Sequence, residues 1–72
     1  MQTLNSLHWA ILESLFLPVE GRNACVLYCL QFTAETVHIA TIKLIDLGLI
    51  EWARTKYILT EKGKEFCNLH GV

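Results

Sequence analysis

The stretch from Phe32 to Glu65 constrains the fold of this chain more than any other part of its sequence. Thr33, with an acidic residue close behind it, predicts a helix start, because a threonine hydroxyl can accept a hydrogen bond from an otherwise unpaired backbone N–H. Gly48 follows an apolar helical pattern and can supply the left-handed residue that ends a helix. The extended apolar pair Leu49–Ile50 comes next, and Thr60, followed by an acidic residue, predicts another helix start. The order is therefore helix, glycine cap, two short strands and helix.

This order of elements resembles the second half of a winged helix-turn-helix domain. In particular, the chain is similar to the MarR and PadR-type regulators, whose wing is bracketed by a GLIE run, here Gly48–Glu51, and an LTEKGKE run, here Leu59–Glu65. The resemblance implies an α+β, mostly α fold: a winged helix-turn-helix with three helices, a short two-stranded wing and a C-terminal helix. It implies one winged-helix domain over residues 1–72, a size at which a single core is only marginally sufficient.

The helix-turn-helix can be aligned with the same family over Val26–Val37. The apolar positions agree with the family pattern, and so does the end of the motif, where Thr33 and Thr36 stand. Leu27 occupies a position where the family has alanine and the two helices approach closely. Gln31 occupies the position of the usual glycine in the turn. These two departures predict a relaxed angle between the helices.

Hydrophobic periodicity predicts the other elements. We expect a first helix over Leu4–Phe16, with Leu4, Leu7, Ile11 and Leu15 on one face and Trp9, Leu12 and Phe16 in a second stripe beside it. A loop over residues 17–22 should follow, and then a second helix that is capped by Asn23, runs through Gln31 and buries Val26, Leu27 and Leu30. We expect a third helix from Thr33 or Ala34 to Leu47 and two strands over Ile50–Ala53 and Lys56–Leu59. The last helix should run from Thr60 to Leu69 and bury Phe66 and Leu69.

Composition points to a partner and to a reducing compartment. Hydrophobic residues make up 53% of the chain and charged residues 18%. For so small a domain we therefore expect a partner to cover part of the apolar surface, and we favour a second copy of the chain. Three cysteines, an odd number without a secretory leader, favour reduced thiols and a cytoplasmic location. No apolar run approaches the roughly eighteen residues of a membrane span, so we expect no membrane partner.

The outward face of the third helix is central to DNA binding, because that helix would enter the major groove. A helical wheel directs Val37, Ala40, Leu44 and Leu47 to the core and leaves Glu35, His38, Ile39, Ile42, Lys43 and Asp46 outside. Glu35 can accept a hydrogen bond from cytosine, and Ile39 can touch a thymine methyl group. This helix contains no arginine, the side chain that most commonly binds guanine. Two outward isoleucines suit a protein interface, or simply a wide helix edge.

Positive charge is concentrated in the predicted wing and at the start of the last helix. Between Arg54 and Lys64 there are four basic residues and one acid, Glu61. A winged helix places such residues on the phosphate backbone or in the minor groove, which would use Arg54 and Lys56. A solvated, charged hairpin explains the same residues. Because the net charge is −1, DNA binding would depend on a dimer that combines two wings.

A second cluster joins cysteine and histidine. Cys25 and Cys29 lie one helical turn apart, as do Cys67 and His70, so together they could form a Cys3His zinc shell. Structural zinc usually binds a C-x-x-C turn, however, and free cysteines are commonly buried as small hydrophobic residues. We therefore expect no metal and no cofactor. No Cys–His pair comes with an orienting acid, and the domain is too small for a buried cleft, so we expect no enzyme activity.

Two functions of different classes remain open. The first is a small DNA-binding protein, a dimeric transcriptional regulator that binds double-stranded DNA and dimerises through its first and last helices. The second is a winged-helix interaction module, an adaptor or inhibitor that binds another protein instead of DNA. The residues expected to contact DNA are Thr33, Ala34, Glu35, Thr36, His38, Ile39, Lys43, Arg54 and Lys56. Those expected in a protein interface are Trp9, Leu12, Phe16, Ile42, Phe66 and Leu69, with Ile39 shared by both sets.

Overall fold

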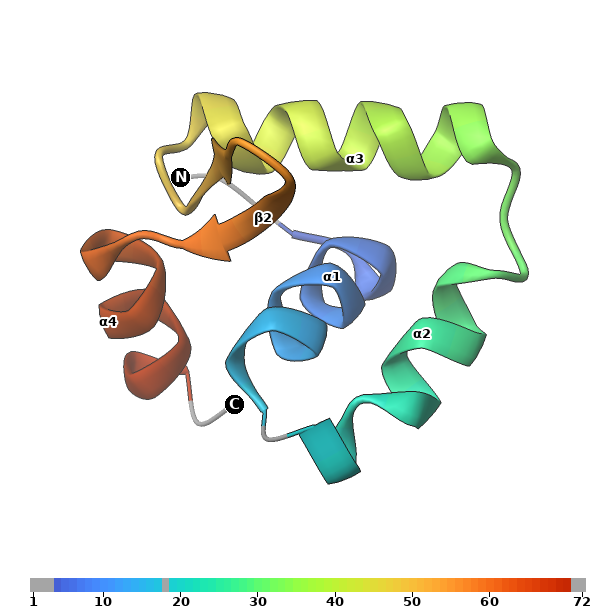
Figure 1. Cartoon of the computed structure of the whole chain (residues 1–72), viewed down its shortest axis with the longest axis horizontal. Helices are drawn as coiled ribbons and strands as arrows, with labels where there is room; N and C mark the ends of the chain where they lie inside the picture. The colour runs from blue at the N-terminus through green and yellow to red at the C-terminus, as the bar shows by residue number, and fades with distance from the viewer. Residues whose placement is uncertain (1–3, 18, 71–72) are drawn as a thin grey trace.

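The structure, a computed structural model, describes residues 4–17 and 19–70. The described elements are α1 (Ser6–Phe16), a short 3-10 helix η1 (Val19–Gly21), α2 (Asn23–Cys29), α3 (Ala34–Asp46), β1 (Ile50–Ala53), β2 (Lys56–Leu59) and α4 (Glu61–Leu69), as Figure 1 shows. The expected α+β, mostly α class, the order of the elements and both strand ranges are confirmed. Within the loop expected over residues 17–22, residue 18 lies outside the described residues.

Side-chain caps start three of the helices. The Asn5 side-chain oxygen accepts from the backbone N–H of His8 at 3.0 Å, and Nδ1 of His8 accepts from the Asn5 N–H at 3.1 Å, which makes a capping box. The hydroxyl oxygens of Thr33 and Thr60 each accept from the backbone N–H three residues later, at 3.2 and 3.0 Å. The starts predicted at Thr33 and Thr60 are confirmed, whereas α1 starts at Ser6 rather than Leu4.

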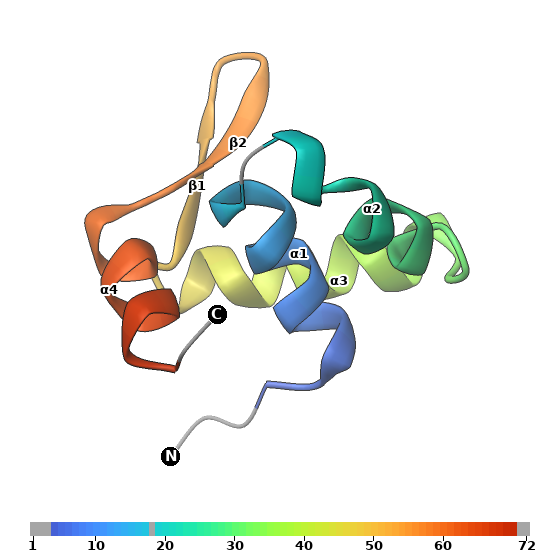
Figure 2. The same ribbon diagram turned by 90° about the horizontal axis from the view of Figure 1, so that it is seen from below.

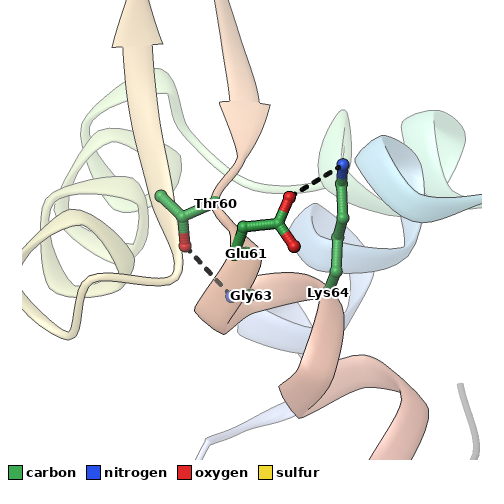
Figure 3. Close-up of polar contacts among 4 residues, drawn as sticks. All are labelled: Thr60, Glu61, Gly63 and Lys64. Atoms are coloured by element: carbon green, nitrogen blue, oxygen red, sulfur yellow. Dashed lines mark hydrogen bonds and ion pairs between the residues drawn. The ribbon is translucent and has the colours of Figure 1, made fainter.

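One junction ties the end of α3 to the wing and to the start of α4. Gly48 has a φ of 77°, so the predicted left-handed cap is confirmed. The Thr60 hydroxyl donates to the Gly48 carbonyl oxygen at 2.6 Å, and the Thr60 N–H donates to the Leu49 carbonyl oxygen at 3.1 Å. Gly63, which Figure 3 shows beside Thr60, lies so close to the same Leu49 carbonyl that a Cβ atom would overlap it.

The two strands form a hairpin that projects from the helices (Figure 2). They are antiparallel and in register from Ile50 opposite Leu59 to Ala53 opposite Lys56. Ile50 is buried at the base of the hairpin, and the tip residue Arg54 has a φ of 63°. The hairpin is thus held in the core at one end and exposed at the other.

The core is built around α1, which lies between α2, α3 and α4 (Figures 1 and 2). Leu12 of α1, Leu44 of α3, Ile50 of β1 and Cys67 of α4 are almost fully buried together. Leu12 therefore belongs to the core, and its assignment to a protein interface is wrong. The stripe that carries Leu12 is covered because β2 and α4 contact the side of α1 that the helical wheel left open.

The sequence interpretation of α2 is also wrong. The helix ends at Cys29 and not at Gln31. Asn23 is its first residue and does not cap it. Val26, Leu27 and Leu30 are exposed, although we expected them to be buried. The buried face of α2 carries Cys25, whose thiol contacts a carboxylate oxygen of Glu13 at 3.5 Å. Small cysteines let α2 lie close to α1, so the larger aliphatic side chains point outward. Leu69, which we expected α4 to bury, is exposed as well.

The junction predicts a difference between two glycines. Gly63→Ala should lower the free energy of unfolding by roughly 2 kcal/mol or more, because the added Cβ forces the Leu49 carbonyl to move and disturbs its bond to Thr60. Gly21→Ala is the matched control, since its Cβ would meet only Leu17 at an ordinary 3.6 Å. Urea denaturation of both variants measures the difference. If the two variants have equal free energies of unfolding, the close contact between Gly63 and the Leu49 carbonyl does not contribute to stability as proposed.

The capping box predicts a dependence of stability on pH. His8 is buried, and burial together with the nearby Lys43 cation lowers its pKa below the ordinary value near 6.5. The unfolded chain then binds the proton more readily, so stability is complete above pH 6.5 and declines as the pH falls below it. Protonation of Nδ1 would also remove the acceptor of the Asn5 N–H. Thermal unfolding from neutral to mildly acidic pH should show a decline that His8→Gln reduces and that the control His38→Gln retains.

Candidate nucleic-acid interface

The N-terminal half of α3 is the most exposed stretch of a helix that lies along one edge of the molecule (Figure 1). At its start, the hydroxyls of Thr33 and Thr36 share a hydrogen bond of 2.8 Å on the surface. Ile39 and Ile42 are 61% and 42% exposed. The outward face predicted from the helical wheel is exposed at Glu35, His38, Ile39, Ile42 and Asp46, together with Ala34. Lys43 departs from the prediction, because it is only half-exposed beside His8.

The turn from α2 to α3 spans Leu30–Thr33 and bends the chain by 116° between the two helices. That angle lies within the range of about 90–120° found in helix-turn-helix motifs. No residue of this turn has a positive φ, so Gln31 can occupy the place of the usual glycine without strain. Leu27 is tolerated for a different reason: it points to solvent and does not lie between the helices.

A cleft of about 560 Å3 opens beside this turn. Its walls come from α1, α2, α3 and β2, and most of them are apolar. The two aliphatic hydroxyls in the wall donate to backbone carbonyl oxygens, Ser14 to Ile11 at 2.7 Å and Thr41 to Val37 at 2.8 Å, and the phenol of Tyr57 is the third hydroxyl group in the lining. The helices α2 and α3 thus leave an apolar cleft between them at an ordinary interhelical angle, so the relaxed angle predicted from Leu27 and Gln31 is not found.

Two exposed cations lie near the tip of the hairpin. Arg54 and Lys56 are both exposed, and the Trp52 ring meets Tyr57 edge-on at 4.9 Å between ring centres. Two further cations lie in the first turn of α4. One of them, Lys64, approaches Glu61 at 3.8 Å (Figure 3), but both side chains are exposed, so the pair adds little stability. The tip of the hairpin is therefore basic, whereas β1 and the start of α4 also carry the exposed acids Glu51, Glu61 and Glu65, and the exposed face of α3 carries both signs as well.

The residues expected at a protein interface do not form one surface. Trp9 and Phe66 stack on each other at 5.3 Å with ring planes 14° apart, and His70 tilts against both rings. Phe16 is half-buried against the core. Of the expected set, Ile39, Ile42 and Leu69 are exposed, and they belong to α3 and α4. The aromatic side chains of α1 and α4 are largely occupied by each other.

The cysteine and histidine cluster is not brought together. Among residues 4–17 and 19–70 no group of three or more His, Cys, Asp or Glu side chains is placed to hold a metal ion. Burial raises the pKa of all three thiols, and for Cys25 the contact with Glu13 raises it further. Protonated thiols are poor nucleophiles and poor metal ligands. In this arrangement Cys25 and Cys67 fill space in the core.

Sequence reasoning missed an exposed apolar stripe on α2, formed by Val26, Leu27, Leu30 and the following Phe32. The absence of charge in this part of the sequence could have revealed the stripe. The segment Asn23–Ala34 contains no charged residue at all, although it includes the surface turn of the motif. A surface helix normally carries charge on its outer face, so an uncharged surface segment indicates contact with something other than water.

No single helix in the described part of the chain is long and apolar enough to cross a membrane, although the bent pair α2 and α3 has sufficient length and apolar character when taken together.

The chain was also compared with known proteins. No family model, no curated protein and no solved structure matches the chain.

Proposed function

We propose that this protein is a small winged-helix DNA-binding protein that acts as a transcriptional regulator. The observation that carries the proposal is the exposed first half of α3, set at 116° to α2 behind a short turn. A helix held in this way can enter the major groove, whose width of about 12 Å admits an α-helix. The basic hairpin provides a second point of contact.

The side chains of α3 suit shape and polarity recognition better than strong charge pairing. The Thr33 and Thr36 hydroxyls lie on the surface at the start of the helix, where hydroxyls commonly donate to phosphate oxygens. Glu35 and His38 are exposed one turn apart and can bond to base edges. Ala34 and Ile39 can contact thymine methyl groups. Sequence preference would come from these contacts.

Affinity for the backbone would come mainly from the wing. The half-exposed Lys43 is the single lysine on α3, whose outward face also carries two acids, Glu35 and Asp46. Arg54 and Lys56 are exposed at the end of the hairpin, where they can reach phosphates. Since each neutralised phosphate releases counterions, binding through the wing would be strongly dependent on salt.

A second candidate function rests on Ile39 and Ile42. Both are well exposed on the same face of α3, where a DNA groove offers few apolar partners. In this alternative, α3 is the docking face for another protein and the wing charge only keeps the hairpin solvated. The two functions differ in salt dependence, because an apolar contact is not weakened by salt as phosphate contacts are.

The DNA-binding proposal predicts a measurable role for wing charge. Arg54→Ala with Lys56→Ala should weaken binding to random duplex DNA and flatten the slope of log affinity against log salt by about two units. The control pair Lys62→Ala and Lys64→Ala removes the same charge from α4 and should have a smaller effect. Fluorescence anisotropy with labelled duplex over a range of salt concentrations measures both slopes.

Two results would contradict the proposal in different ways. Equal slopes for the wing pair and the α4 pair would remove the wing from the contact. Failure of the unmodified protein to bind duplex DNA even at low salt would reject DNA binding and favour the protein-docking alternative through Ile39 and Ile42.

A further inference from the structure

The largest group of exposed apolar side chains lies on and just after α2, and DNA binding does not explain it. The group, here called the α2 patch, consists of Val26, Leu27, Leu30 and Phe32, which are 46%, 63%, 72% and 36% exposed. Single exposed apolar residues are ordinary, but a contiguous set of this size marks a contact surface. No basic residue accompanies it within Asn23–Ala34.

The α2 patch is continuous with the apolar cleft beside the turn. Val26, Leu30 and Phe32 belong to the patch and also line the cleft. The Phe32 ring meets Tyr28 of α2 edge-on at 5.3 Å, which places it beside the helix that carries Val26 and Leu27. Helix α2 lies on the opposite side of the molecule from α4, as Figure 1 shows. The patch is thus separate from the stacked aromatic rings of α1 and α4.

We infer that the α2 patch is the contact surface between two copies of this chain. In a two-fold symmetric dimer the same surface meets itself, so a charge near the symmetry axis is brought close to its own copy, whereas a charge farther out meets a different residue. A self-pairing surface must therefore be nearly free of charge at its centre. The uncharged segment Asn23–Ala34 meets this condition over its whole length, and its edges carry Arg22 and Glu35, which have opposite signs.

The exposed area agrees with a dimer of modest strength. At roughly 150–200 Å2 for a fully exposed large apolar side chain, the exposed fractions of the α2 patch correspond to about 300–450 Å2 of apolar surface. Homodimer interfaces are about 65% apolar, so the whole contact would cover about 450–700 Å2 on each copy. That is less than the ~800 Å2 per partner of a standard interface.

Other occupants account for the patch less well. A small apolar ligand could enter the cleft, but it would leave Leu27 exposed, since that side chain does not line the cleft. A charged partner such as nucleic acid finds no cation in the segment. A second copy covers both the cleft opening and the outer side chains of α2 with the same kind of surface.

Sedimentation analysis of the full chain over a wide micromolar range tests the inference. The unmodified protein should show a concentration-dependent monomer–dimer equilibrium. Leu27→Glu with Leu30→Glu should raise the dissociation constant by about 100-fold or more, because four carboxylates would meet at the two-fold axis. Both positions are exposed in the monomer, so circular dichroism should change little, and the thermal midpoint should change little when it is compared below the dissociation constant, where the unmodified protein is also monomeric.

The matched control is Leu69→Glu, which places the same charge on a leucine that is 83% exposed at the other side of the molecule. It should leave the dimer intact. A protein that remains monomeric at high concentration, or a dimer that Leu69→Glu disrupts while the α2 double variant does not, would overturn the inference. If the double variant unfolds, concentration-dependent amide NMR shifts of the unmodified chain decide the question, because they should be confined to α2 and the turn.

Discussion

The fold depends on the contact between Thr60, Gly63 and the turn at Gly48. The Thr60 hydroxyl accepts from the Gly63 N–H and donates to the Gly48 carbonyl, while the Leu49 carbonyl receives the Thr60 N–H and packs against Gly63. A single residue thereby caps α4 and holds the end of α3. The hairpin leaves and returns at this point, so its direction relative to α3 is set here. Any binding surface that combines α3 with the wing relies on this junction.

The parts of the fold that were predictable from the sequence are those that local chemistry determines. Thr33 and Thr60 cap helices through hydroxyls three residues from their donors, and Gly48 adopts the left-handed conformation that glycine tolerates. The strand ranges followed from short β-prone segments between these signals. The outward position of Glu35, His38 and Ile39 followed from helical periodicity together with the predicted start of α3. None of these required knowledge of how the helices pack.

The errors arose where packing decides between two possible faces of a short helix. In α2 both the stripe of Cys25 and Cys29 and the stripe of Val26 and Leu30 are apolar, and periodicity does not rank them. The face with the smaller cysteines is the buried one, because small side chains allow a close approach of α2 to α1, where Glu13 contacts Cys25. Leu12 was misassigned for the same reason, since β2 and α4 come from distant parts of the sequence to cover this side of α1.

The proposed dimer and the proposed DNA contact would influence each other through α2. This helix of seven residues is packed against α1 on one side, while the cleft beside the turn leaves its approach to α3 incompletely filled. Of the residues of α2 only Cys25 is buried, whereas α3 buries Ala40, Thr41 and Leu44. A second copy on the α2 patch would hold α2 in place and, through the turn at Leu30–Thr33, fix the angle at which α3 is presented. Coupling of this kind is reciprocal, so DNA that selects one angle would strengthen the dimer by the same factor.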